Sequence, residues 1–180
     1  LELTFVSVTI KKFGTVSLLI QKIKKVYDDY RHKLELKNKM GFLHLETFVL
    51  LSQGQFERAL IAVDEINRMI ESSYKDLDPV QLLLLDYACF DVYFRNKDFK
   101  SAQYYIHKIF AYGSEIREDI QASARLANLI LQYEQQEYEH LGYVWQSTYR
   151  YLMKKQRIEQ PEAIILEFLK STLKFTSGKQ

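Results

Sequence analysis

The chain has 180 residues, of which 47% are hydrophobic and 27% charged, the balance of an ordinary globular protein rather than a disordered one. Only 6 glycines and 2 prolines leave few places for tight turns, which argues against an all-β fold. The single cysteine, Cys89, cannot form an internal disulfide, so nothing in the sequence points to an oxidising compartment.

The net charge of +2 is unevenly distributed, with +5 in residues 1–40, −7 in residues 41–140 and +4 in residues 141–180. Basic ends around an acidic centre fit contacts with proteins better than a continuous nucleic-acid track, so no nucleic-acid partner is predicted. No apolar run reaches the roughly 18 residues that span a membrane, so no membrane association is predicted and a cytoplasmic location is expected. The chain begins at Leu1 rather than Met, and we expect a fragment or a processed form of a longer chain.

The first half of the chain is predicted to be helical. Residues 1–12 are apolar enough for a strand, but the repeat described below favours the remnant of a first helix. A turn at residues 13–15 follows, then helices over about 15–37, 39–53 and 55–73. Gly54, after the second of these, suits a left-handed helix C-cap.

Asp78-Pro79-Val80-Gln81 is the best helix start in the chain, because Asp78 can cap it, Pro79 fits the first helical position and Gln81 can complete a capping box. The helices that follow are expected at about 79–96, 98–112, 115–135, 137–157 and 160–174. The sequence therefore predicts an all-α fold of about nine helices in one domain, residues 1–180.

An aromatic residue recurs at the start of every second helix, in the order Phe13, Phe56, Phe99 and Tyr138, with spacings of 43, 43 and 39 residues. Three positions later stand Val16, Ala59, Ala102 and Leu141, and seven positions later stand Ile20, Val63, Ile106 and Trp145. An aromatic at the corner of a helical hairpin followed by a small residue lets two helices approach closely. This pattern predicts an array of helical hairpins.

The turns Gly54-Gln55-Phe56-Glu57-Arg58-Ala59 and Lys97-Asp98-Phe99-Lys100-Ser101-Ala102 resemble the turn signature of the tetratricopeptide repeat (TPR), although the period here is about 40 rather than 34 residues. The resemblance covers most of residues 1–157. It implies an antiparallel helical-hairpin array, a TPR-like α-α superhelix, whose concave face is lined by the first helix of each pair and holds a peptide or a partner domain.

If this chain has such a concave face, the resemblance implies the following candidate partner-binding residues on the first helix of each pair: His44, Phe48, Leu51, Tyr87, Asp91, Phe94, Arg95, Leu126, Ile130, Tyr133 and Glu134. Each of them can instead serve core packing or a solvated helix face. Asp91 and Arg95 are four residues apart on one helix, so they can also pair with each other.

Catalytic and metal-binding patterns are weak in this sequence. Glu137-x-x-His140 has the spacing of a di-iron ligand pair, but the sequence has no second such pair, and a solvated first helical turn explains it better. Cys89 lies on an apolar stripe and reads as a buried small hydrophobe rather than a nucleophile. The sequence also lacks a phosphate-binding glycine loop, a cysteine pair for zinc and a Gly-x-Ser-x-Gly elbow. No catalytic residue, metal ligand or cofactor is predicted.

The leading hypothesis is therefore a non-catalytic scaffold that binds a segment of a partner protein on the concave face of a helical array. The first alternative is a regulatory TPR-like module attached to a DNA-binding or signalling domain outside these residues. The second is a metal enzyme that uses Glu137 and His140. The identity of the partner and the oligomeric state stay open.

Overall fold

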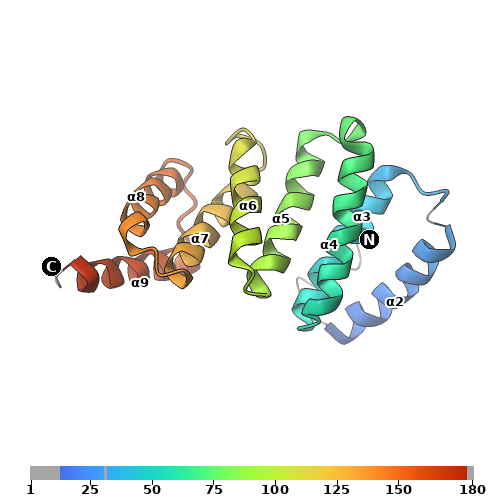
Figure 1. Cartoon of the computed structure of the whole chain (residues 1–180), viewed down its shortest axis with the longest axis horizontal. Coiled ribbons are helices and arrows are strands. Elements are labelled where there is room, and N and C mark those ends of the chain that lie inside the picture. Colours follow the sequence, from blue (N-terminus) through green and yellow to red (C-terminus); the bar gives the residue numbers. More distant parts are fainter. Residues whose placement is uncertain (1–12, 31, 178–180) are drawn as a thin grey trace. The chain divides into compact units, whose positions relative to one another are not determined.

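The computed structural model describes residues 13–30 and 32–177 (Figure 1). These residues form eight α-helices, one short 3-10 helix and no strand, so the all-α prediction is confirmed for them. The helix expected within residues 1–12 lies outside the described residues. The chain divides into two compact units, residues 1–98 and residues 99–180.

The described part of the first unit contains α2 (Phe13–Tyr30), α3 (Leu36–Ser52), α4 (Phe56–Ser73), the 3-10 helix η1 (Tyr74–Asp76) and α5 (Pro79–Arg95). Helix α3 packs against α2, α4 and α5, and α4 also packs against α5. Only three residues join α3 to α4, and the two helices pack against each other, so they form a hairpin.

The second unit contains α6 (Phe99–Ala111), α7 (Glu118–Glu134), α8 (Tyr138–Lys154) and α9 (Gln160–Ser177). Helix α7 is its centre, because it packs against α6, α8 and α9. Helices α8 and α9 also pack against each other. This arrangement leaves a cleft on either side of α8, as described below.

The start of α5 follows the sequence prediction. The Asp78 carboxylate accepts a hydrogen bond from the Gln81 backbone N–H at 2.9 Å, and the Gln81 side chain accepts one from the Asp78 backbone N–H at 3.1 Å. Pro79 occupies the first helical turn. The predicted capping box is confirmed, and it satisfies backbone donors that would otherwise lack a partner inside the helix.

Four helices end in the same left-handed turn. The residue with positive φ is Gly54 after α3, Lys97 after α5, Gln136 after α7 and Gln156 after α8, with φ values of 70°, 61°, 60° and 54°. The next backbone N–H donates to the carbonyl five residues earlier, in the pairs Gln55–Leu50, Asp98–Tyr93, Glu137–Gln132 and Arg157–Leu152, at 2.9–3.0 Å. This is the Schellman motif, and the left-handed C-cap predicted at Gly54 is confirmed.

The helix predicted over residues 15–37 is wrong at both ends. Helix α2 begins at Phe13, so Gly14 and Thr15 lie inside it and do not form a turn. It ends at Tyr30, whose carbonyl accepts a hydrogen bond from the Lys33 N–H at 2.8 Å, and Glu35 is extended before α3. The segment between α2 and α3 contains no glycine or proline, so the sequence gives no strong local signal for a break there.

The other helix ends differ from the predictions by up to three residues. Helix α7 begins at Glu118 rather than residue 115, because Arg117 adopts φ 49°, a left-handed conformation that a helix does not accommodate. Helix α8 ends at Lys154 rather than residue 157, because Gln156 is left-handed in the same way. Helix α9 continues to Ser177, three residues past the predicted end.

The core of the first unit lies between α3, α4 and α5. Its fully buried large side chains are Leu43, Ile66, Leu83, Leu85 and Phe90. On α2, Tyr27 is buried and its ring stacks on Phe42 with centroids 4.2 Å apart, whereas the neighbouring Val26 and Tyr30 are exposed. Among the helices of this unit that the structure describes, α3 is the one that packs against α2.

The core of the second unit joins α7, α8 and α9. Its buried cluster consists of Ala122, Leu126, Leu129, Leu141, Leu152, Leu166 and Leu169. The small repeat residues Ala59 and Ala102 have no exposed surface, as expected where two helices approach closely. The preceding aromatic Phe56 is 38% exposed, so it covers the corner of its hairpin from outside and is not enclosed in it.

Candidate functional site

The candidate residues of the first unit lie on two helices that pack against each other. His44, Phe48 and Leu51 belong to α3, and Tyr87, Asp91, Phe94 and Arg95 belong to α5. His44 and Tyr87 are 43 residues apart, and so are Phe48 and Asp91, so each pair occupies equivalent positions in successive repeats. Helices α3 and α5 pack against each other, and we call these seven residues on them the α3/α5 face.

The side chains of the α3/α5 face differ in how much of their surface is exposed. Phe48 is 43% exposed, which is unusual for a phenylalanine in the middle of a helix whose neighbouring apolar residues are buried. Leu51 is only 5% exposed and therefore belongs to the core. His44, Tyr87, Asp91 and Phe94 are partly exposed, and Arg95 is exposed.

The α5 side of the face is ordered by its own contacts. The Phe90 ring packs against Tyr87 and Phe94 with centroids 5.9 and 5.6 Å apart. The Arg95 Nε donates to the Asp91 carboxylate at 2.8 Å, which confirms the predicted pairing. These contacts hold a cation, an anion and aromatic rings in place on one helix.

The candidates in the second unit are arranged differently. Leu126 is buried in the α7–α9 core, and Ile130 is partly exposed. The Tyr133 ring meets Phe168 of α9 edge-on, with centroids 5.6 Å apart, so part of this face of α7 is covered by the last helix. Glu134 is exposed at the end of α7.

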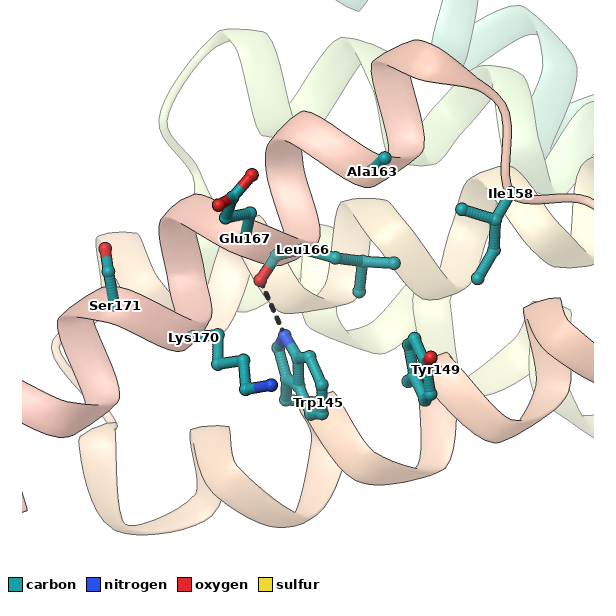
Figure 2. Close-up of a pocket in the computed structure, with 8 residues that line it drawn as sticks. All are labelled: Trp145, Tyr149, Ile158, Ala163, Leu166, Glu167, Lys170 and Ser171. Atoms are coloured by element: carbon teal, nitrogen blue, oxygen red, sulfur yellow. Dashed lines mark hydrogen bonds between the residues drawn. The ribbon is translucent and has the colours of Figure 1, made fainter.

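A pocket of about 630 Å³ opens between α8 and α9 (Figure 2). Its lining residues are Trp145, Tyr149, Ile158, Ala163, Leu166, Glu167, Lys170 and Ser171. The volume lies within the range of small-molecule and side-chain binding sites. Only Trp145, through its place in the repeat, was singled out from the sequence.

Trp145 organises this pocket. Its indole N–H donates to the Leu166 carbonyl of α9 at 2.8 Å, and its ring stacks nearly parallel on Tyr149, with centroids 5.1 Å apart (Figure 2). The Lys170 ammonium lies 5.4 Å from the Trp145 ring centroid, within the distance of a cation–π contact. The indole N–H is thus already satisfied, and the pocket offers aromatic and aliphatic surface with charges at its edge.

The structure shows where the residues considered for metal binding and nucleophilic chemistry lie. Glu137 and His140 are both exposed, and no group of three or more described acidic, histidine or cysteine side chains could hold a metal ion. Cys89 has no exposed surface, as predicted, and the Ser171 hydroxyl donates to the Phe168 carbonyl at 2.6 Å. Burial, together with the nearby Cys89, raises the pKa of the Tyr93 phenol above its ordinary value.

No protein-family model matches the chain, and neither a curated protein nor a solved structure shows a significant match. Within the described residues, none of the helices combines the length and the apolar character needed to cross a membrane.

Proposed function

We propose that this chain is a non-catalytic scaffold, a TPR-like array of antiparallel helical hairpins, that binds a segment of a partner protein on the α3/α5 face. The observation that carries the proposal is the exposure of Phe48, 43%, among helix neighbours that are buried. A folded chain gains by burying such a side chain, and a partner can supply the cover.

The composition of the α3/α5 face supports binding of a protein segment. Aromatic residues and arginine are enriched among the residues that dominate binding energy at protein interfaces. Here Phe48 offers apolar surface, while Arg95 and Asp91 offer a donor and an acceptor that already hold each other in place. Less conformational freedom is lost on binding when side chains are held in this way.

The regular turns support the array. Helices α3, α5, α7 and α8 all end in the same left-handed motif, and the small residues Ala59 and Ala102 are buried at equivalent positions. Repeats of this kind stack neighbouring hairpins and present an extended surface.

Affinity capture from lysate tests the proposal, with wild type beside a Phe48→Ala/Arg95→Glu variant. The matched control is Ile61→Ala/Arg58→Glu, which makes the same two kinds of change at exposed positions of α4. We expect a protein that wild type and the control retain and that the α3/α5 variant loses by at least tenfold. Circular dichroism verifies that both variants keep their helices.

Because Arg95→Glu places two acidic residues four apart on α5, it also costs a few tenths of a kcal/mol in helix stability. Phe48→Ala alone avoids this cost and should still weaken capture. Equal capture by all three proteins, or equal loss in the control, would remove the α3/α5 face from consideration.

A further inference from the structure

A second cleft, of about 330 Å³, lies on the other side of α8, between α6, α7 and α8. Phe110 of α6, Arg125 and Asn128 of α7, and Ser147 and Thr148 of α8 contribute to its lining. Because Tyr143 of α8 also lines it, the cleft combines one cation, one amide and three hydroxyl groups with the aromatic ring of Phe110. It lies wholly within the second unit and is separate from the α3/α5 face.

Aromatic rings hold the Arg125 guanidinium in place. Its central carbon lies 4.2 Å from the Tyr151 ring centroid and 5.1 Å from the Phe110 ring centroid. Tyr151 is fixed in turn, because its hydroxyl donates to the Ser114 carbonyl at 3.2 Å. Ring contacts of this kind involve the face of the guanidinium and leave its N–H groups, which lie in the plane, for other partners.

No described residue takes those N–H groups. The Arg125 Nε is buried and has no hydrogen-bond partner, and no described carboxylate forms an ion pair with Arg125. Glu115 and Glu118 both bind Lys155 instead, at 2.6 and 2.8 Å. Buried polar groups in proteins normally have a hydrogen-bond partner, and this partly buried guanidinium has no acceptor for its N–H groups among the described residues.

Asn128 lies one helical turn after Arg125 and is also incomplete. It is 8% exposed, and its Oδ1 is buried without a partner. A half-turn of the amide exchanges Oδ1 with the Nδ2 group and places a donor where the unpaired acceptor now lies. Arg125 and Asn128 would then both offer donors, and a single acceptor group in the cleft could satisfy both.

We propose that this cleft binds the carboxylate group of a ligand. The two oxygens of a planar carboxylate match the N–H groups of Arg125, and Asn128, Ser147 and Thr148 offer further hydrogen bonds. Arg125 is the one charged residue in the lining, so its charge balances a monoanion better than a doubly charged phosphate. The carboxylate can belong to a small free acid or to an acidic side chain of a protein, and the probes below distinguish these sources.

The test follows the Arg125 Nε–H resonance by ¹H–¹⁵N NMR on the full chain during titration with three probes. Acetyl-glutamate methylamide carries one carboxylate, acetyl-glutamine methylamide is its neutral isostere, and butyrate is a free acid. We expect a saturable shift with the glutamate probe and at least tenfold weaker binding of the glutamine probe. Equal binding of butyrate and the glutamate probe assigns the site to free acids, whereas tighter binding of the glutamate probe assigns it to acidic side chains.

Three variants test whether the donors of the cleft carry the binding. Arg125→Lys keeps the charge but loses the planar pair of donors, and we expect at least tenfold weaker binding, read from backbone amide shifts around the cleft. Arg117→Lys, on a residue that pairs with Asp119 outside the cleft, should bind as wild type does. If Arg125→Lys fails to fold, Thr148→Val takes its place and should weaken binding several-fold.

Three results would overturn the proposal. They are the absence of a saturable shift with both carboxylate probes, equal binding of the glutamine and glutamate probes, and unchanged binding in the Arg125→Lys or Thr148→Val variant. Tighter binding of inorganic phosphate than of butyrate would overturn the choice of a carboxylate. The α3/α5 face takes no part in these titrations, so their outcome is independent of the capture experiment.

Discussion

Replacing Gly54 by alanine tests whether the left-handed turns are required by the fold. Gly54 has φ 70°, and a Cβ added there would have no atom within 4 Å, so the change acts on the backbone alone. The left-handed conformation costs a residue with a Cβ about 1–2 kcal/mol. The lower entropy of the unfolded alanine chain offsets about 0.4–1 kcal/mol of this, which leaves a destabilisation of about 1 kcal/mol.

Gly142→Ala is the matched control. Gly142 lies inside α8, and its added Cβ also has no atom within 4 Å, but its φ is not positive. Alanine in a helix interior is more stable than glycine by roughly 0.5–1 kcal/mol. The same chemical change is therefore expected to lower the free energy of unfolding at Gly54 and raise it at Gly142.

Thermal and urea denaturation followed by circular dichroism measure both variants. For a unit of about 100 residues, 1 kcal/mol corresponds to a change in Tm of about 4–8 °C. If the two units unfold separately, Gly54→Ala should shift the transition of the first unit and Gly142→Ala that of the second. A Gly54→Ala protein as stable as wild type, or more stable, would refute the assignment of a left-handed cap at this position.

Three further predictions concern single contacts. Asp78→Ala removes the capping box of α5 and should cost about 1 kcal/mol, measured by urea denaturation. Trp145→Phe removes the 2.8 Å hydrogen bond to the Leu166 carbonyl and should lower stability by about 1 kcal/mol in the same assay. The hydrogen bond from Arg117, together with its charge, lowers the pKa of Asp119 to about 2. Because this pKa is depressed in the folded state, the stabilisation is complete above about pH 4 and is lost as the pH falls towards 2. A carboxyl ¹³C titration should show that midpoint in wild type and a midpoint near 4 in Arg117→Ala, and equal midpoints would contradict the pairing.

Features set by neighbouring residues could be predicted from the sequence. Asp78 and Gln81 form their capping box with atoms three residues apart, so the sequence contains both halves of it. Gly54 marks its turn because only glycine adopts positive φ without a penalty. The buried residues of α6, Ala102, Tyr105, Ile106 and Ile109, are spaced in the sequence as the 3.6-residue period of a helix requires for one covered stripe.

Turns without such markers could not be predicted. Gln156 adopts the left-handed conformation of Gly54 although it is not glycine, and the segment after Tyr30 contains no glycine or proline. The break at Gln136, which is not glycine either, was predicted only because Tyr138 continues the repeat. In these cases packing against other helices decides where the helix ends, and a local pattern does not contain that information.

The two clefts depend on contacts between distant residues and were missed for that reason. Trp145 reaches the Leu166 carbonyl across 21 residues of sequence, and Ile158 enters the same pocket from the loop between α8 and α9. The signal available was the spacing of Trp145 and Tyr149, four residues apart on one helix face. Arg125 gave no comparable signal, because only the fold shows that its guanidinium meets two rings and no carboxylate.

Because Cys89 is buried, the rate at which a thiol reagent labels it can measure local opening of the protein. The sequence has one cysteine, and in the folded chain its side chain has no exposed surface. A thiol reagent can therefore react only when α5 separates from its neighbours or the unit unfolds, so the labelling rate at low reagent reports the free energy of that opening. A partner that binds the α3/α5 face would stabilise α5 and slow the labelling, so the same thiol would detect binding without any added probe.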